Sequence, residues 1–325
     1  MKEPTLPYQP IRQKLYSGDE LFQGFEPDET ASWGQTLDFA IYRHFVMKGR
    51  HTPTDPYMRM MQALHDNAIM QSIVAFIEGR RVAAIMGGQL MPRDSAVYRD
   101  VAVFAHRLTK NGILICTGGG PGAMEASHLG ASFAKETVSE LDKAIALLKT
   151  QPVVPAMGNI VGPGGIVDPL LVDKAHAWFK PAYEIAMSIS SPCEGLAIPT
   201  WHYGHEPTTP FATHIAKCFQ NSIREDGLLA FAKQGIVYSE GKAGTIQEIF
   251  QDSAQNYYRS FDCFSPMVLF GTKYWTTTYP VVGILQKLFT PDDFARYVLV
   301  TDDVEAAAQF IEGFASQSGP TTACT

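Results

Sequence analysis

The sequence predicts an α/β protein built on a doubly wound parallel sheet, and two patterns lead to this fold class. Short apolar runs typical of buried strands alternate with segments of helical spacing from residue 81 onward. Two of these runs end in glycine-rich turns, at 118–126 (GGGPGAMEA) and 240–248 (EGKAGTIQE), and each turn opens into a helical segment. Strands that alternate with helices pair in parallel, and ligands bind at the carboxyl ends of such strands.

Residues 1–79 precede this alternation and predict an N-terminal helical extension. Apolar residues recur at helical spacing over 37–45 and again over 58–64, and Pro53 and Pro56 separate the two segments. Proline breaks helices because it lacks an N–H group and clashes with the preceding turn. We interpret the extension as a cap on the sheet domain rather than as a catalytic unit.

The predicted sheet domain spans 80–318, and its elements follow one another in a regular order. Strands are predicted at 82–86, 112–116, 196–198, 235–238 and 267–270. Helices are predicted at 97–108, 123–134, 139–149, 170–189, 211–233, 245–258, 275–289 and 304–315. The last residues, 319–325, are expected to form a flexible tail.

Charge and composition exclude several classes of function. The 325 residues include 26 Lys and Arg against 33 Asp and Glu, a formal net charge of −7, with no extended basic block. That balance argues against a nucleic-acid partner. The five cysteines form no CxxC pair, as is typical of a reducing compartment. No segment has the ~18 apolar residues of a membrane span or the apolar core of a signal peptide. We expect a cytoplasmic protein with no membrane partner.

Each glycine turn predicts an anion site. A strand, a glycine turn and a helix N-terminus direct free backbone N–H groups and the helix dipole at one point. Two such turns in one αβ chain are a stronger signal than one. The alternative, that both turns are only tight connections between a strand and a helix, stays open.

At these turns the sequence resembles a known family, the "lonely guy" (LOG) nucleoside 5′-monophosphate phosphoribohydrolases, formerly labelled lysine decarboxylases. Their signatures are a GGGxxG-type turn and a PGGxGTxxE turn. The first turn of this chain matches closely. The second matches at four positions, which are Gly241, Gly244, Thr245 and Glu248.

The second turn also departs from the family pattern. Glu240 stands where the family has proline, and Lys242 stands where it has its second glycine. The Lys242 side chain either obstructs a phosphate or adds a positive contact to it. Glu240 is compatible with a bound anion if it points away or pairs with Lys242. Arg224 lies at nearly the distance from this turn at which the family has its catalytic arginine.

The resemblance covers about 80–300 and implies a Rossmann-like fold with an insertion at about 131–192. The spacing allows this insertion, since connections in αβ units are usually short. The resemblance also implies hydrolysis of nucleoside 5′-monophosphates to free base and ribose 5-phosphate in purine metabolism, with no cofactor and no metal. The helical extension fits a longer bacterial branch of monophosphate nucleosidases. The family further implies a homodimer or higher homo-oligomer. An aromatic segment at 255–258, together with Phe250, would suit a symmetric interface, although these residues could equally pack in the monomer core.

The residues themselves fit this chemistry. Cleavage of an N-glycosidic bond passes through an oxocarbenium-like centre, which a carboxylate stabilises while it orients water. Glu248 lies one helical turn after Thr245, so its carboxylate can face a phosphoribose bound at that helix N-terminus. Arg224 supplies a fixed planar cation for the base or the phosphate. The alternatives are a helix-stabilising acid for Glu248 and a solvated cation for Arg224.

Further substrate-binding candidates lie in the turns that follow the strands. Arg93 either reaches the phosphate or caps its own loop, and Glu125 either bonds the sugar or base or is an exposed helix acid. The full predicted set is Gly87, Gly88, Arg93, Gly118, Gly119, Gly120, Gly122, Met124, Glu125, Gly241, Lys242, Gly244 and Thr245.

The polar run at 201–206 (WHYGHE) invites a metal-site interpretation. Its His-x-x-His spacing lies in a loop and lacks the helical frame of a metalloprotease motif, so we predict no metal. We expect a loop over the site in which His202 or Tyr203 faces the base.

Three classes of function therefore stay open. The first and favoured one is the phosphoribohydrolase. The second is a non-catalytic nucleotide-binding or sensing protein of the same fold, and the third is an interaction protein whose glycine turns are only structural.

Overall fold

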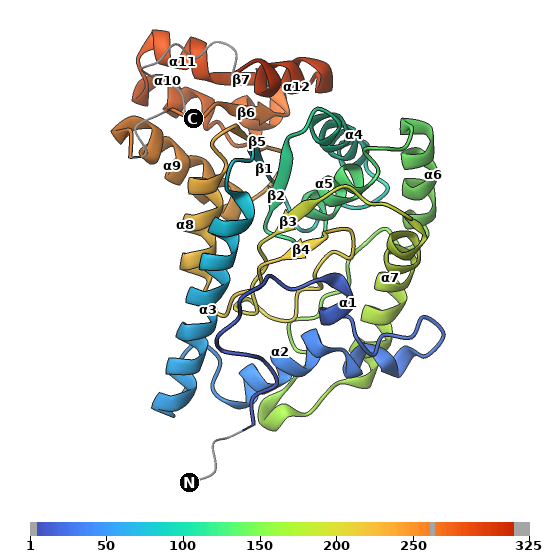
Figure 1. Ribbon diagram of the computed structural model, residues 1–325. Helices are drawn as coiled ribbons and strands as arrows, with labels where there is room; N and C mark the ends of the chain where they lie inside the picture. The colour runs from blue at the N-terminus through green and yellow to red at the C-terminus, as the bar shows by residue number, and fades with distance from the viewer. Residues whose placement is uncertain (1–4, 261–263, 315–325) are drawn as a thin grey trace.

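The computed structural model describes residues 5–260 and 264–314, and its centre is a seven-stranded sheet. Every strand pair in the order β4-β3-β2-β1-β5-β6-β7 is parallel. Helices lie on both faces of this sheet (Figure 1). The predicted α/β fold with a doubly wound parallel sheet is confirmed. The predicted tail at 319–325 lies outside the described residues.

The strand order reverses at β1. From β1 the chain runs outward through β2, β3 and β4, and it then returns to the other side of β1 for β5. The carboxyl ends of strands at such a switch point form the usual ligand site of an open α/β sheet. The strands are β1 (Val82–Met86), β2 (Leu114–Thr117), β3 (Gly195–Ala197), β4 (His214–Ile215), β5 (Gly235–Tyr238), β6 (Met267–Phe270) and β7 (Val298–Thr301).

The helices fall into an N-terminal set, an insertion and the sheet domain. The N-terminal set is α1 (Gly18–Leu21), η1 (Thr30–Gln35), α2 (Leu37–Met47) and α3 (Pro56–Ile77). The insertion holds α6 (Val138–Leu148), η2 (Pro163–Gly165) and α7 (Pro169–Ser188). The remainder are α4 (Ala96–Lys110), α5 (Ala123–Ser132), α8 (Asn221–Phe231), α9 (Ala243–Tyr258), η3 (Tyr274–Thr278), α10 (Val282–Leu288), α11 (Pro291–Tyr297) and α12 (Val304–Gly313). The described helices are each too short or too polar to cross a membrane.

Side chains of β1 alternate between two hydrophobic cores, one for each face of the sheet. Val82, Ala84 and Met86 share a core with α2, α3 and α8. Ala83 and Ile85 share the other core with α4, α5 and α12. The N-terminal extension therefore packs in the same core as the strands.

Two predicted helices were wrong in extent. The predicted helix at 211–233 begins only at Asn221, because the preceding residues form β4 and pair with β3. The predicted helix at 275–289 is divided at Pro280 into the π-turn η3 and the helix α10. Sequence periodicity also missed α11 and β7, which are short and follow each other directly.

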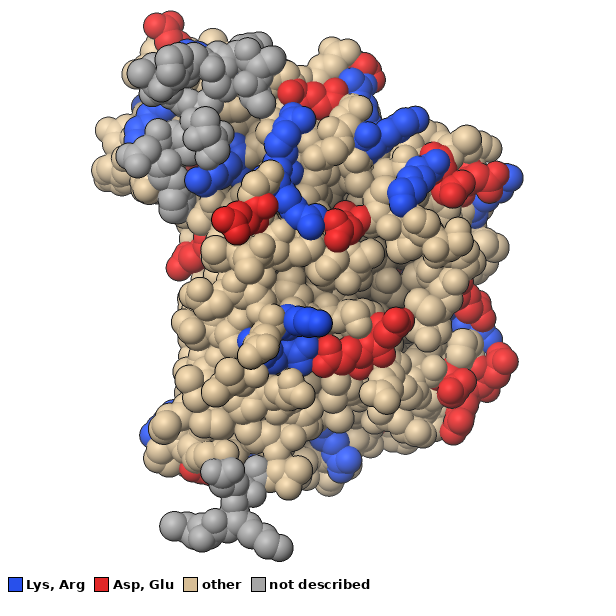
Figure 2. Space-filling view, viewed as in Figure 1, with Lys and Arg blue, Asp and Glu red and all other residues tan. Residues whose placement is uncertain are grey.

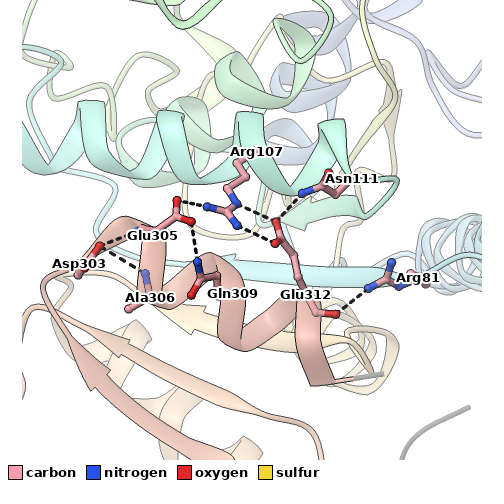
Figure 3. Close-up of polar contacts among 8 residues, drawn as sticks. All are labelled: Arg81, Arg107, Asn111, Asp303, Glu305, Ala306, Gln309 and Glu312. Atoms are coloured by element: carbon pink, nitrogen blue, oxygen red, sulfur yellow. Dashed lines mark hydrogen bonds and ion pairs between the residues drawn. The ribbon is translucent and has the colours of Figure 1, made fainter. Parts of the chain in front are cut away.

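The helix α12 is fastened to α4 by a polar cluster around Arg107 (Figure 3). Arg107 donates from Nε and Nη2 to the two carboxylate oxygens of Glu312, at 2.9 Å each, and it also bonds Glu305. Asn111 donates to Glu312 at 2.7 Å. Planar, bidentate pairs of this kind fix geometry as well as adding energy. The cluster holds α12 over the same face of the sheet as α4.

Acidic and basic side chains are mixed on the surface. On the face drawn in Figure 2 they lie interspersed, often next to one another. The aromatic segment proposed for self-association is exposed at Tyr257 (53%) and Tyr258 (76%), whereas Phe250 packs against the core. This exposure agrees with an interface but does not test one, so the oligomeric state stays a prediction.

The contact between α4 and α5 depends on Gly130. A Cβ at Gly130 would lie 1.9 Å from the carbonyl oxygen of Ala102. We expect Gly130→Ala to force the helices apart and to lower the free energy of unfolding by about 1–3 kcal/mol in urea titrations. Gly283→Ala is the control, because nothing in the described part of the chain lies within 4 Å of a Cβ there. Equal stability of the two variants would contradict the close contact.

Candidate active site

Three turns meet at the carboxyl ends of β2, β1 and β5. The N–H of Gly88, after β1, donates to the carbonyl of Glu240 at 2.8 Å, and the N–H of Ala123 donates to the carbonyl of Gly88 at 3.3 Å. A Cβ on Gly122 would lie 2.3 Å from the Gly88 oxygen, and one on Gly241 would lie 2.1 Å from Oγ1 of Thr245. These approaches require glycine. The structure therefore brings both predicted glycine turns, and the Gly87-Gly88 turn, to one place.

Both helices that follow the glycine turns begin without a side-chain cap. Within the described ranges, neither Gly122 at α5 nor Lys242 at α9 caps its helix with a side-chain hydrogen bond. The first turn is buried, whereas Lys242 and Gly244 at the start of α9 are exposed. Of the two helix N-termini, that of α9 is the accessible one for an anion.

Arg224 of α8 lies against the first glycine turn. A Cβ on Gly118 would be 3.0 Å from Nη1 of Arg224. Nε and Nη2 donate to Oδ1 of Asn221, at 3.2 and 2.8 Å, and Asn221 in turn donates to the Tyr203 hydroxyl at 2.7 Å. The guanidinium is thus fixed, with Nη1 directed at the turn. Sequence reasoning missed Asn221, although it lies one helical turn before Arg224.

Glu248 lies on α9, close enough to Arg224 of α8 for their charges to interact. Its side chain is half-buried. Burial raises the pKa of Glu248 to about 7, a shift that Arg224 opposes and Glu225 reinforces. A carboxyl group that titrates near neutral pH can take or give a proton under physiological conditions, and such groups cluster at functional sites.

Glu206 is a second carboxylate at the site, and sequence reasoning missed it. A Cβ on Gly120 would lie 2.7 Å from its Oε1 and 2.9 Å from its Cδ. Burial raises the pKa of Glu206, against the lowering effect of Arg224 and Lys217. The only sequence signal was its place at the end of the polar run at 201–206, where the histidines drew attention instead.

Arg93 and Glu125, both members of the predicted substrate-binding set, bond to each other. The two side chains form a buried bidentate ion pair, with both N–O distances at 2.7 Å. Arg93 also donates to the carbonyl of Trp178 at 2.9 Å, and Tyr98 donates to Glu125 at 2.7 Å. Their polar groups are occupied by one another. Through Arg93 and its bond to Trp178, the pair joins α5 to α7, and substrate binding by these two residues stays a prediction.

The two histidines of the loop at 201–210 lie in different surroundings. His205 is buried among Trp33, Phe39 and Tyr42, and burial lowers the pKa of its imidazole to about 4. His202 lies beside His51 instead, with ring centroids 4.8 Å apart. No group of three His, Cys, Asp or Glu side chains suited to a metal occurs in the described ranges.

The two departures from the family pattern both leave the second turn open. The Glu240 carboxylate lies beside Gly271, with Oε1 3.9 Å from a Cβ placed there. Tyr274 donates to the Gly241 carbonyl at 2.7 Å and so fixes the turn from that side. The Lys242 side chain is exposed. The negative charge of Glu240 thus points toward β6, and the positive charge of Lys242 is free to meet a ligand.

A buried ion pair ties the N-terminal extension to this site. Nζ of Lys217 lies 2.8 Å from Oδ1 of Asp38, on α2, and also donates to Thr208 at 2.9 Å and to the backbone oxygen of Glu206 at 3.3 Å. Trp201 Nε1 donates to Asp38 at 2.8 Å. Asp38 thereby anchors the loop that carries Glu206.

A second buried acid anchors α8. The Asp66 carboxylate, on α3, accepts from the backbone N–H groups of Phe219 and Gln220 at 2.9 and 2.8 Å. His65 lies beside it, with Nδ1 3.1 Å from Oδ1. These bonds fix the two residues that directly precede α8. The N-terminal extension therefore positions both Glu206 and Arg224.

Comparisons with known proteins add little about function. No protein-family model matches the sequence, and neither does any curated protein. The X-ray structure of TM1055, a target of the Northeast Structural Genomics Consortium, is similar, with 20% sequence identity and a TM-score of 0.44. That match covers 72% of this chain and 99% of the other. Its description names no activity, so function has to be inferred from the site itself.

The buried pair gives a stability prediction. Asp38→Asn leaves the Lys217 ammonium buried without a counter-charge, and we expect a loss of about 3–5 kcal/mol in the free energy of unfolding. Adding Lys217→Met to Asp38→Asn should recover part of this loss, because both charges are then gone. Asp142→Asn, which breaks the exposed pair with Arg99, should cost no more than about 1 kcal/mol. Additive losses in the double variant would contradict the pairing.

The raised pKa of Glu248 gives a pH prediction. The folded protein binds this proton more tightly than a free carboxyl group does, whose pKa is 4.5. The resulting stabilisation is complete below that value and is lost as the pH rises through about 7. Urea unfolding from about pH 5 to about pH 8 should show Glu248→Gln gaining stability relative to wild type as the pH rises. Exposed Glu78→Gln is the control, and a parallel pH dependence of both variants would disprove the assignment.

Proposed function

We propose that the protein hydrolyses the N-glycosidic bond of nucleoside 5′-monophosphates and releases free base and ribose 5-phosphate. The observation that carries the proposal is the convergence of Arg224 and Glu248 beside the uncapped N-terminus of α9. The resemblance of both glycine turns to the LOG signatures supports the same activity.

The N-terminus of α9 suits the 5′-phosphate. Its first N–H groups have no side-chain cap, and Gly244 leaves open space beside them in the described part of the chain. The helix dipole favours a dianion at this point. Lys242 adds a positive charge next to the same position. The phosphate fixes the sugar, which lets the remaining groups act on C1′.

Glu248 suits the chemistry at C1′. As the bond to the base breaks, positive charge develops on the ribose, and a carboxylate beside it stabilises that charge. The same carboxylate takes a proton from the attacking water. Arg224, held by Asn221, keeps Glu248 ionised for part of the neutral range and offers a planar cation to the substrate.

The second candidate, a nucleotide-binding protein without turnover, is favoured by the two departures in the second turn. Lys242 stands where the family pattern has a glycine. Its exposed side chain leaves the turn unobstructed, which argues for the enzyme. An assay of base release from a panel of monophosphates, run beside calorimetric nucleotide binding, separates the two candidates. Binding without turnover selects the second one.

Two substitutions test the catalytic assignment. Glu248→Gln keeps size and hydrogen bonding but removes the charge, so we expect kcat to fall about a hundredfold, or about 3 kcal/mol, with nucleotide affinity nearly unchanged. Arg224→Ala should also lower kcat, and the double variant should be little worse than the poorer single one if both act on one step. The control is Arg99→Ala, which removes an exposed arginine paired with Asp142. Near wild-type turnover by Glu248→Gln would refute the mechanism.

A further inference from the structure

Glu206 has a buried carboxylate oxygen with no assigned task. Its Oε1 is inaccessible to solvent, and no hydrogen-bond partner for it exists among the described residues. The nearby ammonium of Lys217 does not serve it, because that group bonds Asp38, Thr208 and the backbone oxygen of Glu206. Burying a carboxyl oxygen without a hydrogen-bond partner costs free energy. We therefore expect this oxygen to bind a ligand or to carry a proton.

The carboxyl group faces the same turn as Arg224. A Cβ on Gly120 would meet Oε1 of Glu206 at 2.7 Å, and one on Gly118 would meet Nη1 of Arg224 at 3.0 Å. Met124 lies beside both positions, with Sδ 2.9 Å from a Cβ on Gly118 and Cε 2.9 Å from one on Gly120. A side chain on either glycine would collide with these atoms, so Glu206, Arg224 and Met124 lie directly against the backbone of the turn. Glu206 and Arg224 therefore contact the same glycine turn.

The turn that Glu206 contacts is not the turn proposed to bind the phosphate. Glu248 and the open N-terminus of α9 belong to the second glycine turn, whereas Glu206 belongs to the first. A monophosphate whose phosphate lies at α9 and whose C1′ lies at Glu248 would extend its base toward the first turn. The two carboxyl groups would then lie at the two ends of the bond that breaks, as glycoside cleavage requires.

We propose that Glu206, in its protonated form, is the general acid that protonates the departing purine, an inference that rests on the proposed function. The C1′–N9 bond breaks and its electron pair passes to the base, while N7 takes the proton of Glu206. Water adds to C1′ and gives its proton to Glu248. Exchange with solvent returns a proton to Glu206 and removes one from Glu248, so each turnover consumes one water.

The surroundings of Glu206 are consistent with this role. Burial favours the neutral carboxylic acid, and it raises the pKa of Glu206 against the opposing charges of Arg224 and Lys217. General acid catalysis by a positioned carboxyl group typically contributes about 10²–10⁴ in rate. The backbone of Glu206 is fixed by Lys217 and by its own N–H bond to Gly204 at 3.0 Å.

The test compares two leaving groups. Glu206→Gln should lower kcat about a hundredfold on a purine monophosphate, whose base leaves poorly without a proton. It should leave nearly unchanged the hydrolysis of p-nitrophenyl ribofuranoside 5-phosphate, whose nitrophenolate leaves without one. Glu194→Gln is the matched control, since Glu194 lies at the amino end of β3 and pairs with Arg80.

Each outcome decides the proposal. Equal losses on both substrates, or no loss on either, overturn it and leave Glu206 a structural residue. If the wild-type protein cleaves neither substrate, the proposed function fails and the inference falls with it. If wild type cleaves both substrates and Glu206→Gln loses only purine release, the proposed function and the role of Glu206 are both supported.

Discussion

The ion pair between Asp38 and Lys217 is the contact on which the site depends. Both side chains are almost completely buried, and each charge is tolerable there only because the other lies beside it. Asp38 also accepts a hydrogen bond from Nε1 of Trp201. Lys217 donates to the Thr208 hydroxyl and to the backbone oxygen of Glu206. Removing this pair would release the loop at 201–210 from the N-terminal extension. The extension is therefore part of the site's framework and more than a cover for the sheet.

The topology of the parallel sheet determines which connections the N-terminal extension has to hold in place. Because the strand order reverses at β1, three turns emerge side by side, and glycine lets their backbones approach one another closely. The turns provide backbone N–H groups. The two carboxyl groups with raised pKa values come from α9 and from the loop at 201–210, and the guanidinium of Arg224 comes from α8, so the three belong to separate connections. Asp38 and Asp66 fix two of these connections from the same N-terminal extension.

Local sequence signals predicted the fold, whereas long-range contacts stayed hidden. Alternating apolar runs and two glycine turns sufficed for the parallel sheet, and motif spacing sufficed to select Arg224 and Glu248 as candidates. Nothing local reveals that Asp38 meets Lys217, 179 residues later, and so Glu206 went unnoticed. The same limit applies to Arg93, because its partner Glu125 lies 32 residues away and no local pattern reveals their ion pair. Periodicity also overextended the helix at 211–233, because strand pairing and Asp66 set its true start.

The charge balance of the site explains how Lys242 can replace a glycine. Arg224 lowers the pKa values of both Glu206 and Glu248, so one fixed cation serves two carboxyl groups. A nucleotide phosphate would bring further negative charge to a place where Arg224 is already engaged. Dipoles at the N-terminus of α9 offset part of that charge, and a mobile ammonium beside them offsets more. Since the Lys242 side chain is exposed and Glu240 is turned toward Gly271, the second turn gains a cation without losing the open backbone that an anion needs.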